Sequence, residues 1–172
     1  MAEYWDLYDN ERKALGRTHL RGRPLPENTY HVVVSVWTVN QDNKLLLTLR
    51  SEEKELYPNL WENTSGSVVS GETSAQAALR ELEEETGIVA TEDELVFLGT
   101  ARKVFSFVDI YLVRKTMKDS AIRLQQGETT AYRWVTLPEL EHIHRQGKLA
   151  FPVAYRFEQF RTLFESMLSP NT

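Results

Sequence analysis

The chain has 172 residues, of which 41% are apolar and 26% charged, and its formal net charge is −5 at neutral pH. This length and composition predict a single globular domain over residues 1–172, and we expect it in the cytoplasm because no apolar run could span a bilayer and no signal-peptide pattern begins the chain. The acidic balance disfavours duplex DNA or RNA as a partner, and the absence of cysteine excludes disulfides, thiolate metal sites and a cysteine nucleophile.

The first part of the chain predicts a β-hairpin extension over residues 1–29. Two short strands flank a turn at Asp9-Asn10, and the second is expected to end at Gly16. Two β-rich runs follow at 31–39 and 44–50. We expect these runs to be central strands of the core sheet.

The middle of the chain predicts a loop and then a helix. Residues 51–64 have no sustained period and contain a proline, which indicates a loop. The helix is expected to begin at Thr73 or Ser74, whose hydroxyl can cap it, and to end at Gly87. Its buried stripe is predicted to be Ala75, Ala78, Leu79 and Leu82.

The last part of the chain predicts strands at 94–100, 103–114 and 132–136 and a helix beginning near Leu137. A final amphipathic helix over 150–168 has an aromatic face formed by Val153, Phe157, Phe160, Phe164 and Met167. Strands before, between and after the helices predict a mixed sheet covered by helices, an α/β fold in the broad sense with its core over residues 30–145. The terminal hairpin and helix are expected either to pack on this core or to form a homodimer.

The helix that follows Gly66 concentrates carboxylates in its last turns. Glu81, Glu84 and Glu85 share one helical face, and Glu83 points away from it. Each like-charge pair costs an isolated helix about 0.2–0.5 kcal/mol. A bound cation would reverse this cost, whereas the alternative interpretation is an acidic face exposed to solvent.

The surroundings of these carboxylates resemble a known motif. Nine residues match the Nudix box position for position: Gly66, Glu72, Arg80, Glu81, Leu82, Glu84, Glu85, Gly87 and Ile88. The segments LLLTLRS (45–51) and WVTLPEL (134–140) also resemble the core of this family. The chain is therefore identified as a member of the Nudix hydrolase superfamily.

The resemblance implies an α/β/α sandwich and a reaction. Such enzymes hydrolyse a phosphoanhydride bond in compounds that contain a nucleoside diphosphate, using Mg²⁺ or Mn²⁺ as cofactor. Hard divalent ions prefer oxygen ligands and lower the pKa of an attacking water. The expected partner is a small nucleotide-type substrate, and the resemblance leaves its identity open, with a nucleoside di- or triphosphate favoured.

The resemblance also assigns roles to individual residues. Glu81 and Glu85 are expected to be the main metal ligands, assisted by Glu84 and by the carbonyl oxygen of Gly66. Arg80 is expected to orient Glu84. Glu72, at the head of the helix, is expected to be structural.

Three further residues are candidates for the site. Glu128, in a loop before the last core strand, is expected to act as a base or metal ligand, and its alternative is an ordinary exposed acid. Arg50 is a candidate phosphate ligand and Trp61 a candidate platform for base stacking. His142 and His144 form an H-x-H pair in a charged stretch, and we do not expect a metal there.

Two other functions compete with hydrolysis. HVVVSVW (31–37) and LYPNLWENT (56–64) resemble the isopentenyl-diphosphate isomerase branch of the superfamily, but Gly66 occupies the position of the isomerase cysteine and Val68 that of its metal-binding histidine. A non-catalytic nucleotide-binding module would have lost one or more carboxylates of the box. None is lost, so hydrolysis is favoured.

Overall fold

The computed structural model describes residues 2–118 and 121–168, which form two sheets and three α-helices. The strands are β1 (Tyr4–Tyr8), β2 (Ala14–Leu20), β3 (His31–Val39), β4 (Leu45–Arg50), β5 (Trp61–Glu62), β6 (Thr64–Ser67), β7 (Leu95–Arg102), β8 (Ser106–Arg114) and β9 (Thr129–Val135). The helices are α1 (Ser74–Thr86), α2 (Leu137–Arg145), α3 (Phe151–Leu168) and the short 3₁₀ helix η1 (Glu92–Glu94). Within these described ranges, no helix is both long and apolar enough to cross a membrane.

The main sheet is mixed, as the sequence predicts. Its strand order is β5-β4-β3-β8-β7, with β6 also paired to β3 and β9 to β4. Strand β3 runs parallel to β8 over nine residue pairs, from His31 to Val39, whereas the other pairings are antiparallel. β3 pairs with β6 over Val33–Val36 but meets β4 at one residue pair only, so β4 diverges from β3 whereas β6 runs beside it.

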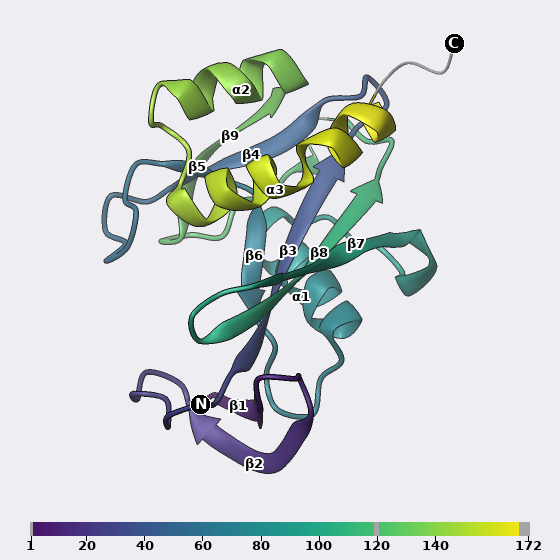
Figure 1. Cartoon of the computed structure of the whole chain (residues 1–172). Coiled ribbons are helices and arrows are strands. Elements are labelled where there is room, and N and C mark those ends of the chain that lie inside the picture. The colour runs from purple at the N-terminus through teal and green to yellow at the C-terminus, as the bar shows by residue number, and fades with distance from the viewer. Residues whose placement is uncertain (1, 119–120, 169–172) are drawn as a thin grey trace.

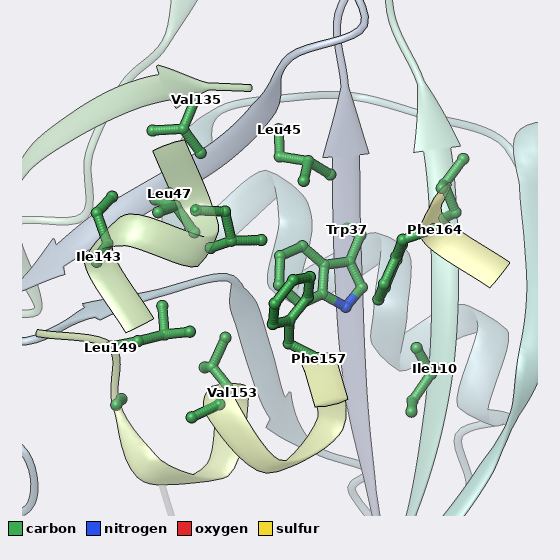
Figure 2. Packing of buried hydrophobic residues seen from close by; sticks show 14 of the residues in the cluster. Trp37, Leu45, Leu47, Ile110, Val135, Ile143, Leu149, Val153, Phe157 and Phe164 are labelled. Carbon is green, nitrogen blue, oxygen red and sulfur yellow. The ribbon is translucent and has the colours of Figure 1, made fainter. Parts of the chain in front are cut away.

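Helices cover both faces of this sheet, which gives the expected sandwich (Figure 1). On one face, Trp37 of β3 packs edge-on against Phe164 of α3, with ring centroids 4.9 Å apart, and Phe157 lies beside them (Figure 2). On the other face, Leu82 of α1 packs in one cluster with Val32, Val34 and Val36 of β3. Burying each large apolar side chain contributes about 1.5–3 kcal/mol, so both helical layers are needed for stability.

Helix α1 has the ends that the sequence predicts. Thr73 accepts a hydrogen bond from the backbone N–H of Gln76 at 3.1 Å, and the Gln76 side chain accepts one from the Thr73 N–H at 3.0 Å. Gly87 ends the helix with a left-handed φ of 72°. The predicted stripe is wrong in part: Ala77 is fully buried, whereas Ala75 and Leu79 are only half-buried.

Two other predicted boundaries are wrong. Strand β2 does not end at Gly16 but continues to Leu20, because a bulge in the pairing lets Gly16 adopt a φ of 62° inside the strand. The predicted loop 51–64 contains β5, which pairs with β4 through Thr48↔Glu62. A two-residue strand is too short to produce a detectable alternation in the sequence.

The N-terminal hairpin packs on the core through three kinds of contact. Trp5 stacks on His31 of β3 with ring centroids 3.9 Å apart and an interplanar angle of 9°. Arg12 donates to both carboxylate oxygens of the buried Asp109 on β8, at 2.6 and 2.5 Å. Asp6 accepts from the Ser70 hydroxyl at 2.7 Å. The hairpin is therefore joined to the sheet and to the turn before α1.

The stacked His31 makes stability depend on pH. Burial lowers the pKa of His31 from 6.5 to about 4. A histidine with a lowered folded-state pKa stabilises the fold above its unfolded pKa, and this contribution is lost as the pH falls from about 6.5 towards 4. The variant His31→Phe keeps an aromatic ring against Trp5 and cannot titrate. We expect both proteins to lose unfolding free energy, measured in urea, between pH 7 and pH 4. The loss in the variant should be smaller than the loss in the wild type by up to about 3 kcal/mol.

The matched control is His142→Phe, which changes an exposed histidine of α2. This variant should follow the wild-type pH profile. Equal acid sensitivity in His31→Phe and the wild type would contradict the role assigned to His31.

Candidate active site

A cavity of about 360 Å³ lies where α1, the ends of β4, β5 and β6, the N-terminal hairpin and the loop before β9 meet. Its lining is almost entirely polar or charged: Glu3, Arg21, Arg50, Lys54, Glu62, Ser65, Gly66, Ser67, Val69, Arg80, Glu81, Glu84, Glu85, Gln125, Glu128 and Thr129. All the candidate site residues of the sequence except Trp61 lie on this cavity. The structure thus brings together residues from positions 3 to 129.

Gly66 and Glu81 approach each other more closely than any side chain at position 66 would allow. Strand β6 places Gly66 opposite Val34 of β3, and α1 packs against β6. A Cβ atom built on Gly66 would lie 1.9 Å from Cδ and 2.0 Å from Oε1 of Glu81. Glycine is therefore required for the Glu81 carboxylate to lie against the backbone of β6.

Arg80 holds the carboxylates of this wall in place. Its guanidinium donates to Glu81 Oε1 at 2.8 Å, to Glu84 Oε2 at 3.2 Å and to the carbonyl oxygen of Ser67 at 3.1 Å. It also forms a two-point contact with Glu72, at 2.7 and 3.0 Å. These contacts raise the pKa of Arg80, with Glu72 as the largest cause, so its charge is permanent.

Glu72 connects this arginine to the turn that precedes α1. Its Oε2 accepts from the Val69 N–H at 3.1 Å, and burial, which alone would raise its pKa, is outweighed by Arg80 and Val69, so the pKa is lowered. The carboxylate is therefore charged and bonded on both oxygens. This geometry is that of a structural residue, which is the role expected of Glu72.

Glu85 is the most unusual group in the cavity. Its Oε2 atom is inaccessible to solvent and accepts no hydrogen bond from any residue that the structure describes. Burial, reinforced by the charges of Glu62 and Glu81, holds its pKa well above the usual value. Burial also raises the pKa of Glu81, although Arg80 opposes the effect. An oxygen without a partner is costly unless another group binds it.

These donors fit a hard divalent cation. Carboxylate oxygens of Glu81, Glu84 and Glu85 and the main chain of Gly66 share one cavity, and Mg²⁺ and Mn²⁺ prefer oxygen ligands. Among residues 2–118 and 121–168, no three His, Asp or Glu side chains are already grouped around one point as ligands. Arg80 occupies oxygens of Glu81 and Glu84, whereas Glu85 Oε2 remains available.

Two further basic residues of the cavity, Arg50 and Lys54, form with their acidic partners what we call the basic wall. Arg50 donates to both carboxylate oxygens of the buried Glu62 at 2.8 Å each, and burial raises the pKa of Glu62 despite Arg50. Lys54 is bonded to Glu128, and the backbone N–H of Ser51 donates to the Glu128 carbonyl oxygen at 2.9 Å. The cavity thus holds carboxylates and cations from several different elements.

Sequence reasoning missed four charged residues of this cavity: Glu3, Arg21, Lys54 and Glu62. Arg21 and Glu3 form an ion pair on the N-terminal hairpin and reach the cavity only because the hairpin packs on the sheet. Glu62 reaches it through the pairing of β5 with β4. No local pattern in the sequence signals either arrangement.

Trp61 and the two histidines lie elsewhere. The Trp61 ring packs against the hydrophobic core with Arg133 over its face, 5.3 Å from the ring centroid, and it does not line the cavity. His142 bonds Gln146 on α2, and His144 pairs with Glu158 on α3. The geometry therefore offers no contact between Trp61 and a ligand in this cavity.

Known proteins are similar to this chain in sequence and in fold. The family model described as NUDIX domain matches residues 29–156. An uncharacterized Nudix hydrolase of Listeria monocytogenes is 37% identical over 153 residues, which cover 85% of this chain and 87% of that protein. An isopentenyl-diphosphate Delta-isomerase of Escherichia coli is 27% identical over 113 residues, 62% of each chain.

Solved structures give the same result for the fold. The DR0079 protein of Deinococcus radiodurans superposes with a TM-score of 0.75 at 24% identity, covering 91% of this chain and 98% of that one. The NUDIX domain of Shewanella oneidensis NrtR, solved with ADP ribose, superposes with a TM-score of 0.62 at 22% identity, covering 78% and 88%. The chain therefore belongs to the Nudix family, and it is a Nudix hydrolase. Membership implies hydrolysis of a pyrophosphate bond in a nucleoside diphosphate derivative.

The contact between Gly66 and Glu81 gives a testable prediction. Gly66→Ala should displace the Glu81 carboxylate and reduce hydrolase activity by on the order of 100-fold or more, because a small displacement of a catalytic group is sufficient for such a loss. Ser67→Ala, one residue away, leaves the carbonyl oxygen that Arg80 uses and should retain most activity. Full activity in Gly66→Ala would show that the Glu81 position is not critical.

Proposed function

We propose that this cavity hydrolyses a phosphoanhydride bond of a nucleoside di- or triphosphate, or of a derivative, with a divalent cation held by Glu81, Glu84, Glu85 and the Gly66 carbonyl oxygen. The observation that carries the proposal is the buried Glu85 Oε2, an acceptor without a partner among the described residues, on a wall of carboxylates. The substrate is a small molecule, and we place the enzyme in the cytoplasm.

The cation, Mg²⁺ or Mn²⁺, would screen the phosphates and lower the pKa of the attacking water. Arg80 keeps Glu81 and Glu84 oriented at 2.8 and 3.2 Å. Because Arg80 also bonds the Ser67 carbonyl oxygen and Glu72, it fixes α1 relative to the strand that carries Gly66. The wall therefore has its geometry before a substrate arrives.

The basic wall supports a role in binding the diphosphate and accepting a proton. Arg50 and Lys54 line the same cavity as the carboxylates, and each is fixed by an acidic partner, Glu62 and Glu128. Glu128 is about half exposed, so water can reach its carboxylate, and we assign it the role of base. Lys54 would keep this carboxylate oriented.

The rival functions have less support. Isomerase activity of the kind found in the related branch is expected to require a cysteine, and the chain has none. A module that only binds nucleotides has no need for the buried, unpartnered oxygen of Glu85 beside Glu81. Product identification with a panel of nucleoside di- and triphosphates, ADP-ribose and isopentenyl diphosphate distinguishes the three functions, because a binder saturates without turnover and an isomerase moves a double bond without releasing phosphate.

Variants of the carboxylate wall test the metal assignment. Glu81→Gln and Glu85→Gln each remove one charged ligand and should lower kcat by roughly 10²–10³-fold, since cation catalysis provides several kcal/mol of transition-state stabilisation. Glu83→Gln is the matched control, because Glu83 lies on the same helix, is exposed and does not line the cavity. Near wild-type activity in both Glu81→Gln and Glu85→Gln would refute the assignment.

Cation binding should also be visible in the stability of the protein. At a cation concentration of about 100 times Kd, binding adds about 2.7 kcal/mol to the unfolding free energy, and about 1 kcal/mol shifts Tm by roughly 2–4 °C for a chain of this size. We expect Mg²⁺ to raise Tm of the wild type and of Glu83→Gln, and to raise that of Glu85→Gln much less. An equal rise in Glu85→Gln would place the cation elsewhere.

A further inference from the structure

A second hollow of about 650 Å³ lies between the turn that joins β7 to β8, the start of α3 and the segment at Tyr57. Figure 1 shows this turn and the first turn of α3 on the same side of the sheet. Four large apolar side chains on it are exposed to solvent: Val104 at 75%, Phe105 at 62%, Phe151 at 66% and Tyr155 at 48%. We call this hollow the aromatic groove. Its exposed apolar surface indicates a binding site rather than a stabilising contact.

The aromatic groove also contains a cation without a partner. The ammonium group of Lys103 forms no hydrogen bond or ion pair with any described residue, although its side chain is about half buried. Burial and the nearby charge of Arg156 lower the pKa of Lys103 to about 8. Arg156 itself is 2% exposed, and its Nε has no partner in the described part of the chain. Lys103, a donor without a partner on an aromatic surface, favours a ligand with hydrogen-bond acceptors.

The aromatic groove and the active-site cavity lie on the two sides of one short segment. The Leu56 carbonyl oxygen accepts from Arg50 Nε at 3.0 Å and from Arg50 Nη2 at 2.8 Å, and Arg50 lines the active-site cavity. The next residue, Tyr57, lines the aromatic groove. This arrangement suits a ligand with an anionic end and an aromatic end.

We propose that the aromatic groove binds the base of the nucleotide substrate, with Phe105 and Tyr155 stacking on the ring and Lys103 donating a hydrogen bond to a carbonyl oxygen of the base. This inference rests on the proposed function, since the diphosphate of the same molecule would lie in the active-site cavity. Guanine, uracil and cytosine carry such a carbonyl oxygen, whereas adenine offers only ring nitrogens as acceptors, which lie elsewhere on the base. The substrate class is therefore nucleoside diphosphates with carbonyl-bearing bases.

The lysine distinguishes this ligand from other occupants. A purely aliphatic group on the diphosphate would cover Lys103 without accepting its hydrogen bond, and a buried donor without a partner is unfavourable. Aromatic side chains stack on any base, at about 1–3 kcal/mol each. Stacking therefore strengthens binding but does not distinguish one base from another. The choice between bases therefore depends on Lys103.

The test compares groove variants with GDP, UDP, ADP and methyl diphosphate, which has no base. Phe105→Ala should raise KM for the three nucleotides about tenfold while kcat and the hydrolysis of methyl diphosphate change little, because one stacking contact is lost. Lys103→Met should remove the preference for GDP and UDP over ADP. Phe97→Ala is the matched control, since Phe97 is 54% exposed on β7 and lies outside the groove.

Binding of GDP to the metal-free protein, measured by calorimetry, separates this inference from the proposed hydrolysis. If GDP binds and Phe105→Ala weakens it while no diphosphate is hydrolysed, the groove is supported and the proposed hydrolysis fails. If nucleotides are hydrolysed equally by the wild type and both groove variants, the hydrolysis stands and the base site is wrong. The base assignment would also be wrong if isopentenyl diphosphate bound tightly, if Phe105→Ala weakened this binding and if Lys103→Met left it unchanged.

Discussion

The active site depends on the repulsion between carboxylates that share one helical face. Glu81, Glu84 and Glu85 could not all remain negatively charged in a partly buried cavity without nearby positive charge. Arg80 provides it on the protein side, and through Glu72 and Ser67 it joins the helix to the turn and the strand that face it. Glu85 Oε2 has no such partner among the described residues. This uncompensated carboxylate oxygen is what makes the site suited to a cation.

The prediction from sequence was strongest where geometry is local. The Glu81, Glu84 and Glu85 face follows from helical periodicity, and the limits of α1 follow from Thr73 and Gly87, each of which acts within one turn of the helix. The mixed sheet and its two helical layers were also predicted, because alternating strands and helices have few ways to pack.

Arg50 and Glu128 were candidates from the sequence, but their neighbours Glu62 and Arg21 could not be predicted, because their place in the cavity depends on long-range packing. Glu62 reaches the cavity through a two-residue strand, and Arg21 through a hairpin that Trp5 and Arg12 join to the sheet. Trp61 lies outside the cavity for the same reason. Its backbone N–H donates to Lys148, and its carbonyl oxygen accepts from Ala150, so the link between α2 and α3 draws its ring towards the core.

The contact at Gly66 has a consequence for how the two enzyme branches differ. The isomerase relatives are expected to carry a cysteine at this position, yet here any Cβ atom would overlap the carboxyl group of Glu81. A cysteine here would bring its side chain and the Glu81 carboxylate into the same space, so the end of the Glu81 side chain would have to turn away from β6. The carboxylate that hydrolysis is expected to use and the thiol that the isomerase is expected to use would therefore exclude each other from one position beside β6.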